Sequence, residues 1–209
     1  IEKTELHKNE AQFSILNGEL KLERRNESID SIRLEFFESF TQQVINHFKL
    51  DLEFKFIVNL NDGPENDVVE TRLCFARPRN SPHICIPDSH IPRLNVICAA
   101  LPSLDTPFDQ KLNKACFNGS DTGRKYIDGS VQRVKFCQKY KNHPKIDAKI
   151  TNFVEQPIDP EILAEFCPIE AQLKYKYILN INGNTTSWER LIWAMTSNSY
   201  CIFIRPPAH

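Results

Sequence analysis

The pattern of apolar positions in the first 60 residues predicts a hairpin, a helix and a strand. Residues 11–22 form two short runs on either side of Asn17-Gly18, a pair that readily adopts the positive φ angles of a tight turn. From residue 31 to residue 50 apolar side chains recur every three or four positions. We therefore expect an amphipathic helix that begins near Asp30 and buries one face, formed by Phe37, Phe40, Val44 and Phe48. The aromatic and β-branched run 54–60 predicts a strand that ends at a turn.

The segment from residue 77 to residue 107 carries many prolines, namely Pro78, Pro82, Pro87, Pro92, Pro102 and Pro107. Proline lacks a backbone N–H, so long helices and central strands are not expected there. We interpret this segment as a crossover that contains one short buried strand, residues 96–100.

After the crossover the chain shows the order strand, glycine loop, helix, twice over. In the first repeat, residues 114–117 lead into loop 118–123 and a helix over about 130–141. In the second, residues 175–181 lead into loop 182–186, where Thr186 and Glu189 have the spacing of a helix capping box. This order predicts an α/β fold with two lobes.

Composition and charge narrow the class of protein. The chain has 209 residues, of which 41% are apolar and 25% charged, as in folded soluble proteins. A net charge of −1 argues against a nucleic-acid partner, because binding a phosphate polymer requires an excess of cations. No apolar run is long enough for a membrane helix. The chain begins without a methionine, so we expect a piece of a longer polypeptide, with further domains as possible partners.

Cysteine usage and glycosylation sequons indicate a compartment. The cysteines are odd in number and lack the C-x-x-C spacing of zinc or redox sites: Cys74, Cys85, Cys98, Cys116, Cys137, Cys167 and Cys201. We interpret them as free thiols in a reducing environment. Sequons at Asn118 and Asn184 fall in the two glycine loops, where a glycan would block a ligand. Both features favour a cytoplasmic over a lumenal location.

Three loops are candidates for chemistry, because ligands of open α/β sheets bind beyond the carboxyl ends of the strands. They are residues 61–64, 118–124 and 182–187. The last two combine glycines, hydroxyl side chains and a following helix, which suits a phosphate. The nearby cations are Arg124, Lys125, Arg133 and Arg190. Neither loop matches a P-loop or a G-x-G-x-x-G motif, so ordinary strand-to-helix turns are the alternative.

Asp62 is the candidate catalytic carboxylate, because it directly follows a predicted apolar strand and would act as a general base on an acceptor hydroxyl. The alternatives are a simple Asp-Gly-Pro turn, or a degenerate metal-binding loop in which Asp62, Glu65 or Asp67 holds a divalent ion. His83 and His90 are interpreted as scattered surface histidines, since prolines between them hinder chelation. We expect no metal site.

Three segments carry a resemblance to a known family. Lys174-Tyr-Lys-Tyr-Ile-Leu-Asn-Ile-Asn-Gly-Asn-Thr-Thr-Ser-Trp-Glu-Arg190, continuing to Ser199, strongly resembles the signature of the CAP10-like glycosyltransferases. These include Rumi-type protein O-glucosyl and O-xylosyltransferases and bacterial lipopolysaccharide-modifying enzymes. Phe56-Ile-Val-Asn-Leu-Asn-Asp-Gly-Pro64 and Cys116-Phe-Asn-Gly-Ser-Asp-Thr-Gly123 are similar to two further elements of the family, in the same order.

The resemblance implies a GT-B-like fold of two Rossmann-like lobes, short at the C-terminus. Residues 1–100 would form the acceptor-side lobe and residues 101–209 the nucleotide-sugar lobe. It also implies inverting transfer from a UDP-sugar to a hydroxyl of a glycan or protein, with no metal or other cofactor. Asp62 would be the general base. The donor would be bound by Gly119, Ser120, Thr122, Gly123, Arg124, Gly183, Asn184, Thr185, Thr186, Ser187 and Arg190.

The chain departs from the family pattern at two places that bear on donor binding. Asn118 stands where the family usually has arginine, which leaves Arg124 or Arg190 as substitutes, and Arg190 is displaced by one residue from the arginine of some members. The family also usually continues well past Ser199. A non-catalytic sugar-nucleotide or glycan-binding module and a metal-dependent GT-A-type transferase therefore stay open as alternatives. The donor sugar, whether glucose, xylose or rhamnose, is not resolved. We expect a bacterial or viral enzyme acting in the cytoplasm.

Overall fold

The computed structural model describes residues 5–62, 70–77, 80–154, 159–184 and 188–205. The chain divides into two compact units, Ile1–Ile91 and Pro92–His209, each of which is described by itself. Both units are mixed α/β with parallel strands, as predicted. The GT-B-like pairing of lobes and the roles assigned to them stay predictions.

The first unit is built on a five-stranded sheet in the order β2-β1-β3-β4-β5. Its strands are β1 (Glu10–Leu16), β2 (Glu19–Arg25), β3 (Phe54–Asn59), β4 (Leu73–Cys74) and β5 (Ile84–Cys85). β1 runs antiparallel to both β2 and β3, whereas β3, β4 and β5 are parallel. Asn17 and Gly18 both have positive φ at the β1–β2 turn, so the predicted hairpin is confirmed.

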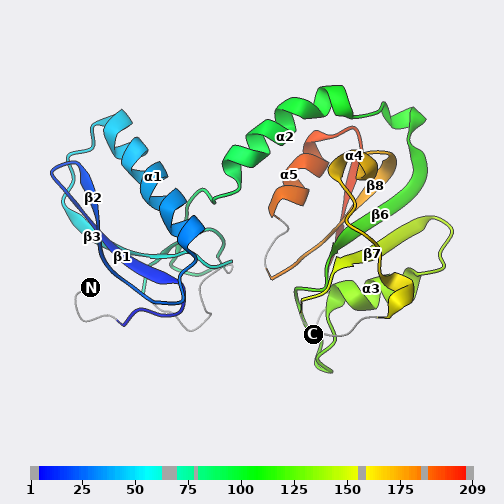
Figure 1. Ribbon diagram of the computed structural model, residues 1–209, viewed down its shortest axis with the longest axis horizontal. Helices are drawn as coiled ribbons and strands as arrows, with labels where there is room; N and C mark the ends of the chain where they lie inside the picture. The colour runs from blue at the N-terminus through cyan, green and yellow to red at the C-terminus, as the bar shows by residue number, and fades with distance from the viewer. Residues whose placement is uncertain (1–4, 63–69, 78–79, 155–158, 185–187, 206–209) are drawn as a thin grey trace. The chain divides into compact units, whose positions relative to one another are not determined.

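Helix α1 (Ser31–Phe48) packs along this sheet (Figure 1). The Asp30 side chain accepts the backbone N–H of Arg33 at 3.0 Å and caps the helix where the sequence predicted its start. Phe37 of α1 contacts Phe13 of β1, with ring centroids 5.1 Å apart. The buried stripe is Leu34, Phe37 and Ile45, so the prediction that Phe48 faces the core was wrong: it is 65% exposed.

The second unit is built on a four-stranded parallel sheet in the order β7-β6-β8-β9. The strands are β6 (Leu112–Ser120), β7 (Ile146–Asn152), β8 (Tyr175–Ile181) and β9 (Tyr200–Ile204). The predicted strand over residues 175–181 is confirmed, and β6 extends the predicted strand at 114–117 in both directions. Gly119 and Ser120, which we expected in a loop, are the last residues of β6.

Helices cover both faces of the second sheet (Figure 1). α3 (Gln132–Tyr140) packs Val134 and Cys137 against one face, with Phe117 and Ile150. α2 (Ile91–Leu104) and α5 (Trp188–Thr196) pack Leu101, Trp193 and Ala194 against the other, with Cys116 and Ile178. The remaining helical turns are η1 (Phe108–Gln110), η2 (Pro160–Ile162) and α4 (Ile169–Gln172). No helix in the described ranges is both long and apolar enough to cross a bilayer.

α2 corrects two predictions about the proline-rich segment. Residues 96–100 belong to this 14-residue helix rather than to a short strand, and its length contradicts the expectation that long helices are absent from this segment. Pro92 is tolerated because it is the second residue of the helix, where no intrahelical N–H bond is made, whereas Pro102, inside the last turn, costs the helix one such bond. The stripe Leu94, Ile97, Cys98 and Leu101 has the spacing of one helical face, and burial of this face outweighs the prolines.

Two buried thiols in the second unit predict a loss of stability at alkaline pH. Cys116 and Cys137 are both 0% exposed, and burial raises the pKa of each to about 12. The unfolded chain ionises its thiols near pH 9 while the folded chain keeps them neutral, so the free energy of unfolding falls as pH rises from about 9 to 12. The expected slope is up to about 1.4 kcal/mol per pH unit for each thiol.

Urea unfolding followed by tryptophan fluorescence measures this slope, since Trp193 is buried in the second unit. Cys137→Ala should flatten the slope above pH 9 relative to the parent chain, whereas Cys85→Ala, which changes an exposed thiol, should not. Equal slopes in all three chains contradict the prediction.

Candidate functional site

The candidate site lies at the carboxyl end of the second sheet, where the strand order reverses. β6 leads through α3 to β7 on one side, and the chain then returns to place β8 on the other side of β6. The loops that follow β6 and β8 therefore leave the sheet at a topological switch point. In open α/β sheets this is the place where ligands bind.

Glycine residues bring these two loops into backbone contact. Gly123 has φ +128°, a conformation that side chains disfavour, and a Cβ there would lie 2.8 Å from the carbonyl oxygen of Asn182. The same Cβ would lie 3.0 Å from Cα of Gly183. Larger residues at position 123 would push the loops apart, so the two predicted glycine loops meet here because of their glycines.

Arg133, from the first turn of α3, joins the ends of β6 and β8. It is 7% exposed, and its Nε and Nη2 donate to the carbonyl oxygen of Ile181 at 3.1 and 3.0 Å. Its Nη1 donates to Thr122 Oγ1 at 3.2 Å and to the carbonyl oxygen of Ser120 at 3.3 Å. Ser120 Oγ and Thr122 Oγ1 are themselves 2.8 Å apart. The guanidinium thus lies beside the hydroxyl groups of the predicted donor loop.

Arg190, from the first turn of α5, reaches the same end of β6. Its Nη2 donates to the carbonyl oxygen of Asn118, and its Nη1 donates to Gln172 Oε1 at 3.2 Å. Among the described residues no carboxylate forms an ion pair with Arg190. Its hydrogen-bond acceptors are therefore neutral oxygen atoms, which leave the positive charge of the side chain uncompensated.

The two guanidiniums flank Phe117 and concentrate positive charge. Their Cζ atoms lie 5.6 Å (Arg133) and 4.8 Å (Arg190) from the ring centroid. Burial, followed by the charge of Arg190, lowers the pKa of Arg133 to about 10, and burial also lowers that of Arg190. A Cβ on Gly119 would lie 3.2 Å from Arg190 Nη2, and one on Gly183 would lie 3.0 Å from Arg133 Nη2. An anion bound here would offset both the burial and the mutual repulsion.

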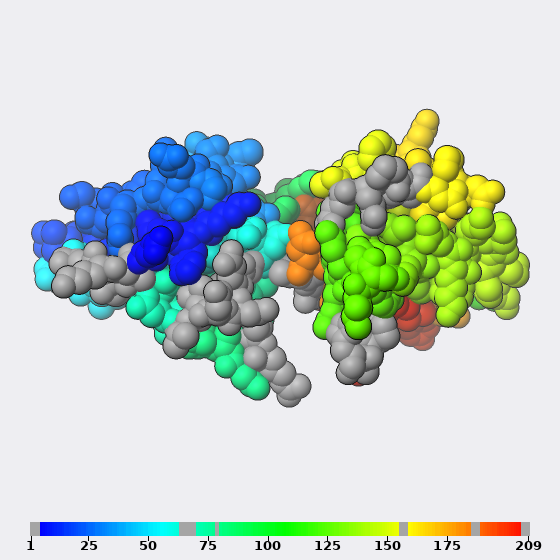
Figure 2. Space-filling model, turned by 90° about the horizontal axis from the view of Figure 1, so that it is seen from below, coloured from blue at the N-terminus to red at the C-terminus, as the bar shows by residue number. Residues whose placement is uncertain are grey.

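The other predicted donor residues differ in how far they are exposed. Thr122 is partly buried, whereas the side chains of Arg124 and Asn184 are exposed. The segment that follows β6 (green in Figure 2) forms part of the surface of the second unit. Thr185, Thr186 and Ser187, together with the capping box predicted from Thr186, lie outside the described residues.

Two buried amides near this end of the sheet lack partners. Asn180, one residue before the end of β8, is 1% exposed, and neither of its amide atoms has a hydrogen bond among the described residues. The same holds for Oε1 of Gln132, which is 3% exposed at the start of α3. Unsatisfied buried polar groups are rare in folded proteins, so both are places where an ordered water or a ligand atom would bind.

Asp62, the predicted base, belongs to the first unit, directly beyond β3. It is partly exposed, and its Oδ1 accepts a hydrogen bond from Arg33 Nη2 at 3.0 Å. Arg33 Nη1 also donates to the carbonyl oxygen of Leu60 at 2.9 Å. Asp62 is thus a carboxylate in an ion pair at the carboxyl end of a strand. Glu65 and Asp67, which would complete a metal loop, lie outside the described residues.

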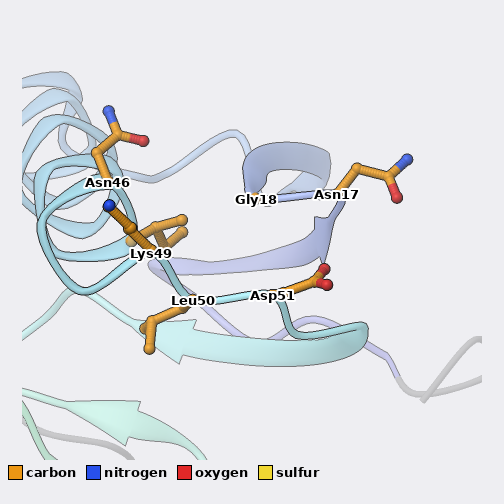
Figure 3. Close-up of a pocket in the computed structure, with 7 residues that line it drawn as sticks. Asn17, Gly18, Asn46, Lys49, Leu50 and Asp51 are labelled. Atoms are coloured by element: carbon orange, nitrogen blue, oxygen red, sulfur yellow. The ribbon is translucent and has the colours of Figure 1, made fainter.

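Other candidate sites carry less chemistry. His83 is 4% exposed and accepts the Arg72 backbone N–H at 3.2 Å, so its interpretation as a surface histidine was wrong. Within the described ranges, no three side chains of the metal-binding types cluster together. A pocket of about 230 Å³ lies between the β1–β2 turn and the end of α1 (Figure 3), and Lys49 and Asp51 are among the residues that line it.

Two contacts of the site were not predictable from the sequence. Phe117 was expected only as a strand residue, and its contact with Arg190 was not. No sequence pattern indicated Gln172, because it lies in a short helix and is 18 residues away from Arg190, to which it binds. Arg133 was identified only as a nearby cation. Its place between Val131 and Val134, which are both buried, was the one available indication that it would point inward.

Comparison with known proteins relates the chain to one class of enzyme. No protein-family model matches it. The chain is 31% identical over 74 residues to a protein named O-glucosyltransferase LpsA from Dichelobacter nodosus. The matched segment is 35% of this chain and 22% of that relative. This partial similarity supports a relationship to glycosyltransferases and nothing finer than that class.

Proposed function

We propose that the chain is part of a glycosyltransferase of the CAP10-like type, which moves a sugar from a UDP-sugar to a hydroxyl group of a glycan or protein. The second unit binds the nucleotide sugar and the first unit supplies the base. The partial similarity to a protein named as an O-glucosyltransferase makes glucose the first donor to test. UDP-xylose and UDP-rhamnose are the other donors to test.

The observation that carries the proposal is the pair of arginines at the ends of β6 and β8. They lie beside hydroxyl groups and glycine backbone, at the switch point of a parallel sheet. A diphosphate is bound by two or more cationic side chains or backbone N–H groups, and glycines allow the backbone to approach it closely. Arg190 Nη2 donates to the backbone carbonyl of Asn118, which supports Arg190 as the substitute for the arginine that the resemblance expects at position 118.

The proposed reaction is a single inverting displacement. Asp62 takes the proton of the acceptor hydroxyl as that oxygen attacks the anomeric carbon. The bond between the anomeric carbon and the diphosphate oxygen breaks, and UDP leaves with the electron pair. Arg133 and Arg190 stabilise the negative charge that develops on the departing diphosphate in the transition state. In this mechanism no step needs a metal ion.

The experiment that tests this function is UDP release from UDP-glucose, UDP-xylose and UDP-rhamnose by the purified chain, with water as acceptor and EDTA present. We expect slow hydrolysis of one donor. Saturable UDP binding without turnover of any donor would instead identify a sugar-nucleotide-binding module. Hydrolysis that EDTA abolishes would point to the metal-dependent alternative.

Arg133→Met is expected to weaken UDP binding about 10- to 100-fold, since hydrogen bonds to charged groups contribute about 1.5–3 kcal/mol each. Arg133→Lys keeps the positive charge but lacks the planar set of N–H donors, so its affinity for UDP should fall less than that of Arg133→Met. The matched control is Lys135→Met on the same helix, whose side chain pairs with Asp128 at the surface. Calorimetric titration measures the three affinities, and parent-like binding by Arg133→Met contradicts the assignment.

A further inference from the structure

The turn that carries Asp62 is held from two sides by side chains that the sequence did not indicate. On one side Arg33 of α1 binds both the carbonyl oxygen of Leu60 and the carboxylate of Asp62. On the other side Asn59, which is 2% exposed, accepts the Asn61 backbone N–H through Oδ1 at 3.1 Å. The three residues after β3 are thus fixed through both the main chain and a side chain.

The supports of this turn are themselves rigid. Asn59 Nδ2 donates to Glu10 Oε1 at 3.4 Å, and Glu10 forms an ion pair with Arg72 at 3.2 Å in which both side chains are nearly fully buried. The backbone N–H of Leu60 donates to the carbonyl of Asn9 at 3.0 Å. On the helix side, the Asp30 cap fixes the backbone of Arg33. A buried charge network of this kind holds its geometry because moving one member leaves another unpaired.

The Arg33–Asp62 contact adds little to stability. The two side chains are 24% and 27% exposed, and ion pairs that are this accessible contribute at most about 1 kcal/mol. The start of α1 is already capped by Asp30, and its buried stripe anchors the helix to the sheet. A planar guanidinium that binds a carbonyl and a carboxylate at once does, however, fix the direction of the carboxylate.

We propose that Arg33 is the positioning residue for Asp62, holding its carboxylate in the orientation from which it takes the acceptor proton. This inference rests on the proposed function. General bases act only when they lie within hydrogen-bond reach of the proton, and a displacement of about 1 Å lowers the rate by up to about 100-fold. Arg33 acts through Asp62 and touches neither the donor nor the acceptor in this scheme.

The test compares Arg33→Gln, Arg33→Lys and Asp62→Asn in donor hydrolysis, with each chain first checked for folding by circular dichroism. Arg33→Gln should lower kcat about 10- to 100-fold and change KM for the donor less than about 3-fold. Arg33→Lys should recover part of the rate, because lysine keeps the charge but binds one acceptor at a time. Arg25→Gln, at the exposed end of β2, should match the parent chain.

The double variant separates positioning from general destabilisation. If Arg33 acts through Asp62, adding Arg33→Gln to Asp62→Asn should cause no further loss of kcat. A full kcat in Arg33→Gln, or an independent and additive loss in the double variant, overturns the role of Arg33 while leaving the function intact. Parent-like hydrolysis by Asp62→Asn overturns the assignment of the base, and hydrolysis of no donor by the parent chain overturns the function itself.

Discussion

Asp62→Asn is expected to lower the rate of donor hydrolysis by about 100- to 10,000-fold, the range that removal of a general base produces. Asparagine is close in size to aspartate and keeps an oxygen that can accept from Arg33, so the turn should survive the substitution. It cannot take a proton, however. The loss should therefore appear in kcat, with the affinity for UDP unchanged, because the proposed donor site belongs to the second unit.

The matched control for Asp62→Asn is Asp51→Asn, an exposed carboxylate that follows α1 in the same unit. It should hydrolyse the donor at the parent rate. Initial rates of UDP release across a range of donor concentrations give kcat and KM for each chain. An Asp62→Asn chain that is folded and retains more than about half of the parent kcat contradicts the role of this carboxylate.

Lys111→Met is expected to lower the free energy of unfolding of the second unit by about 3–5 kcal/mol, because it leaves a buried carboxylate without its counter-ion. The Lys111 and Asp105 side chains are 0% and 3% exposed and form an ion pair. Lys111 Nζ also donates to the Leu173 carbonyl oxygen at 2.7 Å and to Ser199 Oγ at 2.8 Å. These contacts tie together the segments that precede β6, β8 and β9.

Urea unfolding monitored by tryptophan fluorescence measures the effect of Lys111→Met. Lys114→Met, which changes an exposed lysine three residues further along, in β6, serves as the control and should change stability by less than about 0.5 kcal/mol. A loss below about 1 kcal/mol in Lys111→Met contradicts the account of the buried pair. Ser199, the last residue of the segment that resembles the family signature, contacts this buried pair rather than the candidate site, so we expect it to contribute to stability.

Local signals were sufficient for most of the elements. Asn17-Gly18 specified the first turn, Asp30 capped α1, and the two runs of strand, glycine loop and helix appear as β6 to α3 and β8 to α5. α2 was not predicted, because the prolines of this segment were given more weight than the helical spacing of its apolar residues. Proline destabilises a helix where it removes an intrahelical N–H bond or clashes with the preceding turn. Pro92 does neither, because it is the second residue of α2.

The convergence of the two glycine loops was also predictable, because the switch-point rule depends only on the order of elements. The partners of the arginines were not. Arg133 contacts Ile181, 48 residues further along the chain. This contact depends on how α3 packs against the sheet, and no local sequence pattern indicates it. Arg33 and Asp62 are 29 residues apart for the same kind of reason. His83 is buried and its ring accepts the backbone N–H of Arg72, 11 residues earlier, a contact that no local pattern indicated.

Calorimetric titration of the parent chain with UDP and with UMP, each with EDTA, tests the central claim most directly. If Arg133 and Arg190 form a diphosphate site, UDP should bind saturably with one site per chain, and at least about 10-fold more tightly than UMP. EDTA should leave both affinities unchanged. Equal affinity for UDP and UMP, or no saturable binding of UDP at millimolar concentration, would contradict a donor site at the carboxyl ends of β6 and β8.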